Sequence, residues 1–399
     1  MSVSRRGFFT GSAAALGAAG LGAAGASRLG GVADAEAPKA PNPLDQRIDF
    51  DGAHQAGILN AGQAQAVFVA LDAIASDRAA LPSGLNALSS KAREVTRGSS
   101  VVRADVDEPP SDSGTLGPSY VPDGLTVTIG FGRSFYDKFG FTLPPGLTSM
   151  PAFANDRLDP ARCHGDVLLQ ICANQRDTVV HALREIMRPV RAAFALRWTL
   201  DGFQSAPRSK GSRRNLFGFR DGTANPNVRD DAEMRRLVWT PEGGTFQVVR
   251  AIRMHVEFWD RVGLREQENM IGRTRATGAP LGGTQELQDP GYPLDPKGAR
   301  IPLDAHIRLA NPRTPQTDAQ RILRRAFNYH RGVDEAGQLD QGLIFVAFNQ
   351  DIARQFATIQ KRLDGEPMVD YITPVGGGYY YVPPGTRGPG DYIGSGFFT

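Results

Sequence analysis

The sequence predicts an α+β fold made of two ferredoxin-like halves with antiparallel sheets. The chain has 399 residues, which is enough for two or three domains of ordinary size. Residues 64–201 read as strand, helix, strand, strand, helix, strand, which is the order of a split βαβ fold. After a basic, Ser-rich junction at residues 208–214, this order partly recurs. Two similar halves with a site between them are therefore the economical interpretation.

The first half is predicted from residue pattern and spacing. Residues 64–74 (AQAVFVALDAI) are rich in strand-forming side chains, and residues 125–132 (LTVTIGFG) alternate as a strand does. The predicted strands cover residues 64–74, 125–132, 166–173 and 195–201. The predicted helices cover residues 78–97 and 178–194.

The second half repeats this order with longer connections. The predicted strands cover residues 246–258, 343–348 and 378–382, and the predicted helices cover residues 259–271 and 351–363. The wide spacing predicts a long insertion at residues 272–305. Because the two halves share no close sequence repeat, their similarity rests on element order alone.

The N-terminus carries the pattern of a twin-arginine export signal. Arg5 and Arg6 precede two phenylalanines and a mild Gly/Ala/Leu run at residues 10–27. The alternative, an arginine pair before a transmembrane helix, is disfavoured because this run is too weakly apolar. We expect a signal at residues 1–35, a linker at 36–46, and a periplasmic or extracellular protein without an integral membrane segment. Since the twin-arginine route carries folded proteins, we also expect a cofactor that is inserted before export.

Charge and cysteine spacing exclude several classes of protein. Lys and Arg number 45 against 42 Asp and Glu, and no block of five or six basic residues occurs. Binding to DNA or RNA is therefore not predicted. Cys163 and Cys172 match neither a zinc knuckle nor the Cys-x-x-Cys-His signature of covalent haem. They could pair in an oxidising compartment, but residues 167–172 read as a buried strand, which favours two core thiols.

Two segments stand out as candidates for chemistry. In residues 217–226 (FGFRDGTANP), two glycines flank Asp221, so the backbone could approach a flat ligand while the carboxylate points at it. The alternative is an ordinary Asp-Gly turn. His306 lies in residues 304–313 (DAHIRLANPR), eighteen residues before Arg324. The other five histidines have no second ligand at metal-site spacing, and we interpret them as structural or solvent-exposed.

These segments resemble the dye-decolourising peroxidase family, haem b enzymes whose hallmark Gly-x-x-Asp-Gly is here Gly218 to Gly222. Residues 163–173, 271–273, 278–281 and 376–379 also look like blocks of this family. With its export signal, the chain most resembles the exported deferrochelatase/peroxidase branch. The resemblance implies two ferredoxin-like domains of the dimeric α+β barrel type, at residues 47–207 and 208–399, with the haem pocket mainly in the C-terminal half.

The resemblance also implies roles for individual residues. His306 would be the proximal ligand of the iron in a non-covalent haem b. Asp221 and Arg324 would stand over the distal face, with Arg325 as a rival for Arg324, and Asp351 would hydrogen bond the proximal imidazole. The other implied haem-binding positions are Gly222, Thr223, Ala224, Asn311, Pro312, Arg313 and, as a propionate partner, Arg273.

The implied reaction explains why these residue types are needed. An ionised Asp221 can take up and return a proton of hydrogen peroxide, and the permanent charge of Arg324 can stabilise the departing oxygen. We therefore expect a peroxidase that oxidises dyes, phenols or other organic reductants. Two alternatives stay open: release of iron from haem, with a role in iron uptake, and a haem-binding module without turnover. The oligomeric state is also left open.

Overall fold

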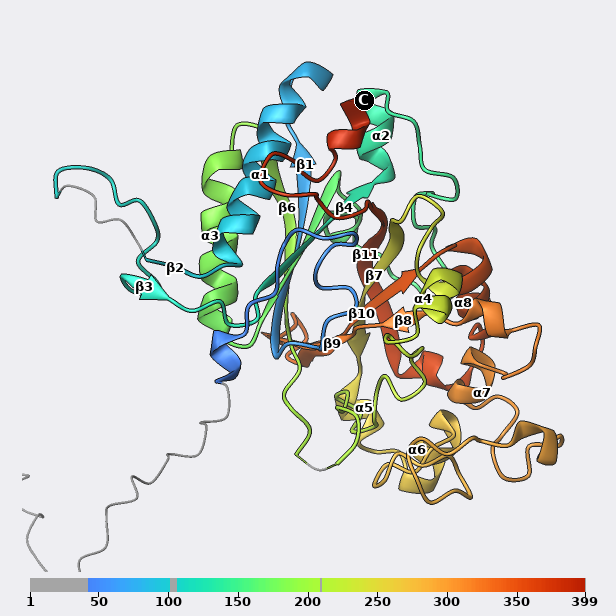
Figure 1. Ribbon diagram of the computed structural model, residues 1–399. Coiled ribbons are helices and arrows are strands. Elements are labelled where there is room, and N and C mark those ends of the chain that lie inside the picture. Colours follow the sequence, from blue (N-terminus) through green and yellow to red (C-terminus); the bar gives the residue numbers. More distant parts are fainter. Residues whose placement is uncertain (1–41, 101–105, 209, 399) are drawn as a thin grey trace, which may run out of the picture. The chain divides into compact units, whose positions relative to one another are not determined.

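A nine-stranded antiparallel sheet forms the centre of the protein (Figure 1). The computed structural model describes residues 42–100, 106–208 and 210–398. The predicted export signal at residues 1–35 and the linker up to residue 41 lie outside this part of the chain. Residues 42–46 of the linker are described, and they contain a short 3-10 turn at Pro43–Asp45.

The first half confirms the predicted order of strands and helices. A short helix, α2 (Arg133–Phe139), and the small hairpin β2 (Ser99–Ser100) and β3 (Ser119–Tyr120) add to that order. The main elements are β1 (Gln65–Ala73), α1 (Leu81–Val95), β4 (Thr126–Gly132), β5 (Val167–Ala173), α3 (Arg176–Val190) and β6 (Phe194–Phe203).

The second half follows the same plan, with several corrections to the predicted elements. The strand predicted for residues 246–258 ends at Met254, because the chain turns into a helix at Val256. The helix predicted for residues 259–271 begins only at Leu264, after an extended Gly263. The helix predicted for residues 351–363 starts as a π-helix at Ala353–Ala357. A strand at Phe327–Val333 was missing from the prediction.

The elements of the second half have the following bounds. The strands are β7 (Thr245–Met254), β8 (Leu323–Arg324), β9 (Phe327–Val333), β10 (Leu339–Asn349) and β11 (Ile372–Val382). The helices are α4 (Asp231–Leu237), α5 (Val256–Trp259), α6 (Leu264–Ile271), α7 (His306–Ala310) and α8 (Thr358–Arg362).

The sheets of the two halves join into one barrel. The strand order is β4-β5-β1-β6 in the first half and β11-β7-β10-β9 in the second, so each half has the ferredoxin-like order with its first and third strands in the middle. One seam pairs β11 with β4, and the other pairs β6 with β9 through Phe203 and Asn328. Eight strands thus close a ring, and β8 extends it beside β10.

Glycines allow the strands to meet at the seams. A Cβ atom on Gly202 of β6 would lie 2.8 Å from the Cβ of Phe327 on β9 and 2.9 Å from a methyl group of Ile344. At the other seam, a Cβ atom on Gly130 of β4 would lie 3.0 Å from the Cβ of Tyr380 on β11. Close packing of the two sheets therefore depends on positions without a side chain.

The core lies on both sides of the barrel wall. Along β1, Val67 and Val69 face α1 and α3, which lie next to each other on one flank of the sheet (Figure 1). Phe68 points the other way, into the barrel, and packs there with Phe327. Cys163 and Cys172 are both buried and unpaired, which confirms the prediction of two core thiols.

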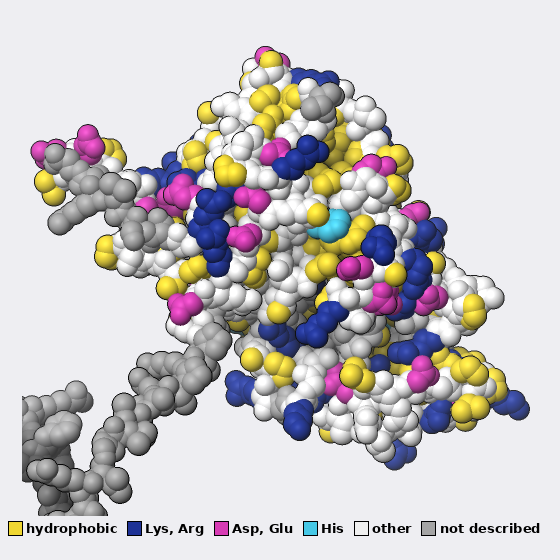
Figure 2. All heavy atoms as spheres, in the orientation of Figure 1, with side chains coloured by type: hydrophobic (Ala, Val, Ile, Leu, Met, Phe, Trp, Pro, Cys, Tyr) yellow, Lys and Arg dark blue, Asp and Glu magenta, His cyan; other side chains and the backbone are white. Residues whose placement is uncertain are grey.

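Acidic and basic side chains are interspersed on the face shown in Figure 2, as expected for a formal net charge of only +3. Within residues 42–100, 106–208 and 210–398, no helix is long and apolar enough to cross a membrane.

Candidate active site

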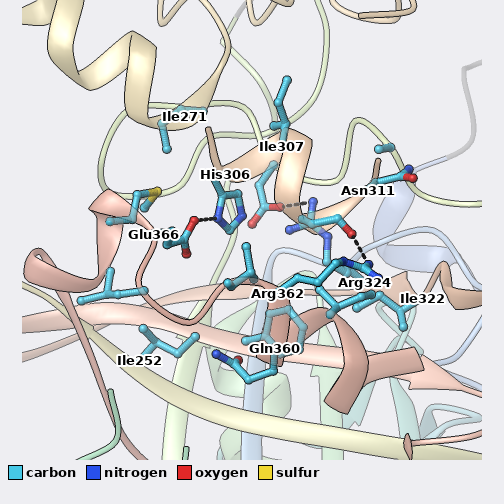
Figure 3. A pocket seen from close by; sticks show the side chains of 18 of the residues that line it. Ile252, Ile271, His306, Ile307, Asn311, Ile322, Arg324, Gln360, Arg362 and Glu366 are labelled. Carbon is cyan, nitrogen blue, oxygen red and sulfur yellow. Dashed lines mark hydrogen bonds and ion pairs between the residues drawn. The ribbon is translucent and has the colours of Figure 1, made fainter. Parts of the chain in front are cut away.

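A cavity of about 370 Å³ lies beside β7 and β10 and is bounded by α7, α8 and the loops around them. Its size is within the range of small-molecule and cofactor sites. Much of its wall is apolar. The apolar side chains of the wall include Ile252, Ile271, Ile307, Ile322, Leu343, Phe345, Phe356, Ile359 and Met368 (Figure 3).

His306, the first residue of α7, borders this cavity. Its Nδ1 lies 2.7 Å from Oε2 of Glu366 (Figure 3). Because an ionised carboxylate only accepts hydrogen bonds, Nδ1 donates, and in the neutral ring Nε2 carries the lone pair. Burial alone would lower the pKa of His306, but the charge and hydrogen bond of Glu366 outweigh it and raise that pKa above its usual value. The ring is therefore both oriented and made more basic by Glu366.

The prediction that Asp351 hydrogen bonds this imidazole is wrong. The carboxylate of Asp351 accepts instead from the backbone N–H of Arg354 at 3.0 Å, at the start of the π-helix. Glu366 takes the expected position from the turn that follows α8, sixty residues from His306. In the sequence, Glu366 stands in a Gly-Glu-Pro turn and looks like any surface acid. Only the fold shows that its side chain is 3% exposed.

Asp221 and Arg324 form an ion pair in the same cavity. Nη2 of Arg324 lies 2.8 Å from Oδ1 of Asp221, and both residues line the cavity together with His306. The loop that carries Asp221 is fixed by a hydrogen bond from its backbone N–H to the carbonyl of Arg213. Gly222 has φ +84°, a conformation that side chains other than glycine rarely adopt.

The neighbouring arginine, directly after the end of β8, points elsewhere, because successive residues of an extended chain face opposite sides. Arg325 is half-buried and donates to the carbonyl of Asn60 and, at 3.1 Å, to Oε1 of Gln63. Burial lowers the pKa of Arg325. The structure thus brings Arg324 to Asp221, whereas Arg325 ties β8 to the loop before β1.

The other predicted haem-binding positions are only partly gathered at the cavity. Five of them line the cavity: Thr223, Ala224, Arg273, Asn311 and Arg313. The other two, Gly222 and Pro312, are next to lining residues in the sequence. The guanidinium group of Arg273 donates to the carbonyls of Gly278 and Glu286 at 2.6 and 2.8 Å, so part of its hydrogen-bonding capacity serves its own loop. Arg313 forms an ion pair with Asp289 at 3.0 Å.

Glu286, which the sequence did not single out, holds the loop around Asp221. Its carboxylate accepts from the backbone N–H of Ser212 at 3.1 Å and from the hydroxyl of Thr223 at 2.9 Å, and it pairs with Arg220 at 3.4 Å. Burial would raise the pKa of Glu286, but the hydrogen bonds from Ser212 and Thr223 and the charge of Arg220 lower it. The insertion at residues 272–305 thus reaches across to the Asp221 loop.

Arg362, also missed, supports the helix that carries His306. It donates to the carbonyls of Leu309 and Ala310, at 2.9 and 3.1 Å. These carbonyls belong to the last turn of α7, where backbone acceptors have no partner within the helix. Neither Glu286 nor Arg362 lies near its partners in the sequence, so no local pattern could reveal them.

The donor set of the cavity fits a haem. A free imidazole nitrogen is the usual protein ligand of haem iron, and the carboxylate of Glu366 fixes the tautomer that exposes it. The apolar wall suits a porphyrin face, and arginine side chains line the same cavity, where they could meet carboxylates. The Asp221–Arg324 pair adds an acid/base group and a fixed positive charge.

Comparison with known proteins identifies the family. The family models described as "Dyp-type peroxidase, N-terminal" and "Dyp-type peroxidase, C-terminal" match residues 55–204 and 212–387. Deferrochelatase of Escherichia coli (strain K12) is 45% identical over 373 residues, which cover 89% of this chain and 88% of the relative.

Solved structures agree with this assignment. The DyP-type peroxidase from Cellulomonas bogoriensis is 36% identical with a TM-score of 0.79, over 90% of this chain and 99% of that one. Ferric DtpA from Streptomyces lividans is 34% identical with a TM-score of 0.80, over 89% and 98%. The α+β barrel found here is the fold of these proteins. The chain therefore belongs to the Dyp-type peroxidase family and is a haem peroxidase.

Proposed function

We propose that this enzyme binds a non-covalent haem b through His306 and reduces hydrogen peroxide with Asp221 and Arg324 as its distal pair. The observation that carries the proposal is the 2.8 Å Asp221–Arg324 ion pair in one cavity with a histidine whose Nδ1 is held by Glu366. A haem-binding module without turnover would need the histidine but not this acid–guanidinium pair.

Each residue would have a distinct task. When bound, haem b would supply the iron for the reaction with peroxide and the redox chemistry that oxidises the reducing substrates. His306 would hold the group through Nε2, and the Glu366 carboxylate would increase electron donation from the ring. Asp221 would accept a proton from the inner oxygen of peroxide and return it to the outer one. Arg324 would stabilise the negative charge that develops on that outer oxygen.

The substrates are proposed from the family. Dyes, phenols and other small organic reductants are the expected electron donors. Export by the twin-arginine route and a periplasmic or extracellular location are proposed from Arg5, Arg6 and the run that follows them. A homo-oligomer and a link to an iron-uptake system are further proposals, and the second follows from the deferrochelatase name of the E. coli relative.

Three variants test the proposed roles of the residues. His306→Ala should lose most of its haem, read as loss of the Soret band per protein. Asp221→Asn keeps the shape of the side chain but cannot accept the proton, so its reaction with hydrogen peroxide, followed by stopped flow, should slow by about 100-fold or more. Arg324→Leu should slow the same reaction by a similar factor.

The matched control is Asp364→Asn, because Asp364 is an exposed acid at the same cavity. This variant should react like the wild-type protein. If Asp221→Asn also kept the wild-type rate, Asp221 would not be the proton acceptor. If His306→Ala kept its Soret band and haem content, the assignment of the iron ligand would be wrong.

Release of iron from haem is a second candidate, favoured by the 45% identity to a protein named deferrochelatase. The holoprotein would be incubated with a reductant under anaerobic conditions, and the porphyrin extracted. Metal-free porphyrin in amounts that match the released iron would support this activity. Intact haem as the only porphyrin recovered would leave peroxide reduction as the proposed function.

A further inference from the structure

The distal pair raises a question of register, because Arg324 is the last residue of β8 and Arg325 follows it directly. Arg324 meets Asp221, whereas Arg325 points towards Asn60 and Gln63 in the loop before β1. A slip of one residue in a strand exchanges the faces of all its side chains. It would bring Arg325 to Asp221 and Arg324 to the acceptors of Asn60 and Gln63. In either register both guanidinium groups would have hydrogen-bond partners. Other contacts must therefore determine which register the strand adopts.

Part of the selection comes from Leu323, which is 2% exposed in the core of the barrel, but the backbone of β8 adds little. It has only two residues and pairs only with β10, through Leu323–Phe348 and Arg324–Ala347. The backbone N–H of Arg325 donates to the carbonyl of Val346 on β10. Backbone groups of successive strand residues point to opposite edges, so the N–H and C=O of Arg324 face away from β10.

The side chain of Asn225 takes up both of these free groups. Its Nδ2 donates to the carbonyl oxygen of Arg324 at 2.7 Å, and its Oδ1 accepts from the N–H of Arg324 at 3.1 Å. One carboxamide thus does what the backbone of a neighbouring strand would do. Among side chains of this length only asparagine carries a donor and an acceptor on the same group.

Asn225 belongs to the same loop as Asp221. Its backbone N–H donates to the carbonyl of Gly222 at 3.1 Å, which closes a tight turn directly after Asp221, and Gly222 supplies the positive φ of that turn. The carboxamide and the carboxylate are therefore four residues apart on one short, closed segment. The carboxamide of Asn225 hydrogen bonds to the backbone of Arg324, and the carboxylate of Asp221 pairs with its guanidinium group.

We propose that Asn225 is a positioning residue for the distal pair: its carboxamide fixes β8 in the register that places Arg324, and not Arg325, on Asp221. This inference rests on the proposed function of Asp221 and Arg324 and assigns Asn225 no contact with haem or peroxide. Its effect on the reaction passes through Arg324 alone.

Amide hydrogen exchange, measured by mass spectrometry on peptides around residue 324, tests the contact without any turnover. In Asn225→Ala the N–H of Arg324 loses its acceptor, so its exchange should speed up by about tenfold or more. Asn227→Ala is the control from the same loop, because Asn227 is exposed and its side chain accepts only from the N–H of Arg229 among the bonds found in the described residues. In Asn227→Ala the backbone N–H of Arg324 should exchange at the same rate as in the wild-type protein.

A double-mutant cycle tests the effect on chemistry. Asn225→Ala should slow the reaction with hydrogen peroxide by about 10-fold to 100-fold, the cost of a misplaced group in an active site. In an Arg324→Leu background the same change should slow it no further, because no guanidinium is left to place. Asn225→Asp keeps the acceptor for the N–H of Arg324 but turns an oxygen towards its carbonyl, so it should also slow the reaction in the wild-type background and not in the Arg324→Leu background.

The outcomes separate this inference from the proposed function. A wild-type protein that does not react with peroxide would overturn both. A reactive wild-type protein with an equally fast Asn225→Ala variant would overturn the role of Asn225 alone. Equal slowing by Asn225→Ala in the wild-type and Arg324→Leu backgrounds would also overturn it, because the effect would then not pass through Arg324.

Discussion

Replacing Glu286 by glutamine should destabilise the protein strongly at neutral pH and weakly in acid. The carboxylate accepts from Ser212 and Thr223 and pairs with Arg220, and the side chains of Glu286 and Arg220 are only 11% and 6% exposed. Hydrogen bonds to a charged group are about twice as strong as neutral ones. The neutral amide would also turn an N–H group towards donors. We expect a loss of about 2 kcal/mol in the free energy of unfolding at pH 7, which is less than the roughly 3–5 kcal/mol for breaking a fully buried pair because glutamine keeps one acceptor oxygen.

The pH dependence follows from the direction of the pKa shift. The pKa of Glu286 is lowered in the folded protein, and in the unfolded chain it is about 4.3. The ionised carboxylate therefore contributes its full stabilisation above the unfolded value and loses it as the pH falls through the folded value. Since glutamine does not titrate, the difference between variant and wild type should be largest at pH 7 and shrink below about pH 4.

Urea unfolding followed by circular dichroism, at pH 7 and at several values down to pH 3.5, measures this difference. Glu266→Gln is the control, because Glu266 is exposed on α6, and it should change stability by less than about 0.5 kcal/mol. A destabilisation by Glu286→Gln that is equal at all pH values, or absent at pH 7, would show that the carboxylate charge does not hold the loop.

Three further changes probe the haem ligand, a seam of the barrel and export. Glu366→Gln should slow the reaction with peroxide by about 10-fold to 100-fold, because the amide supports the imidazole of His306 less well; stopped-flow rates equal to wild type would contradict this. Gly202→Ala should cost about 1–3 kcal/mol by overpacking against β9 and β10, seen as a lower Tm, and an unchanged Tm would mean that the seam has room. Arg5→Lys with Arg6→Lys should retain the precursor in the cytoplasm in cell fractionation, whereas normal export would refute the signal assignment.

The sequence predicts well what is local. The Gly-x-x-Asp-Gly loop combines glycines with an acid over five residues, and the structure places Asp221 there in the cavity with Gly222 at positive φ. The strand-forming side chains of residues 64–74 and the alternation in residues 125–132 predict β1 and β4 nearly to their ends. Such segments carry their own signal, because residue type and local pattern favour a strand without reference to distant parts of the chain.

Contacts between distant segments are where prediction fails. Asp351 was assigned to His306 by its position in a motif, whereas Glu366 reaches the ring from another turn. Strand β9 was missed because only its first three residues are buried and the rest are exposed. A strand whose second half faces solvent lacks the alternation that periodicity detects. The pairing of strands from different halves depends on both edges at once, and no single segment encodes it.

The two seams make this chain the single-chain counterpart of a dimer. A cut in the exposed segment at residues 205–208 would break no strand pair, so the two fragments should stay together and keep the ring. Production of the second half alone would be different, because β9 and β11 would then present open edges to the solvent. Open edges bind other strands, so the fragment should associate with a second copy of itself. The covalent connection between the two halves thus keeps a first half beside every haem-binding second half. The edges of β9 and β11 therefore stay paired and do not become sites of aggregation.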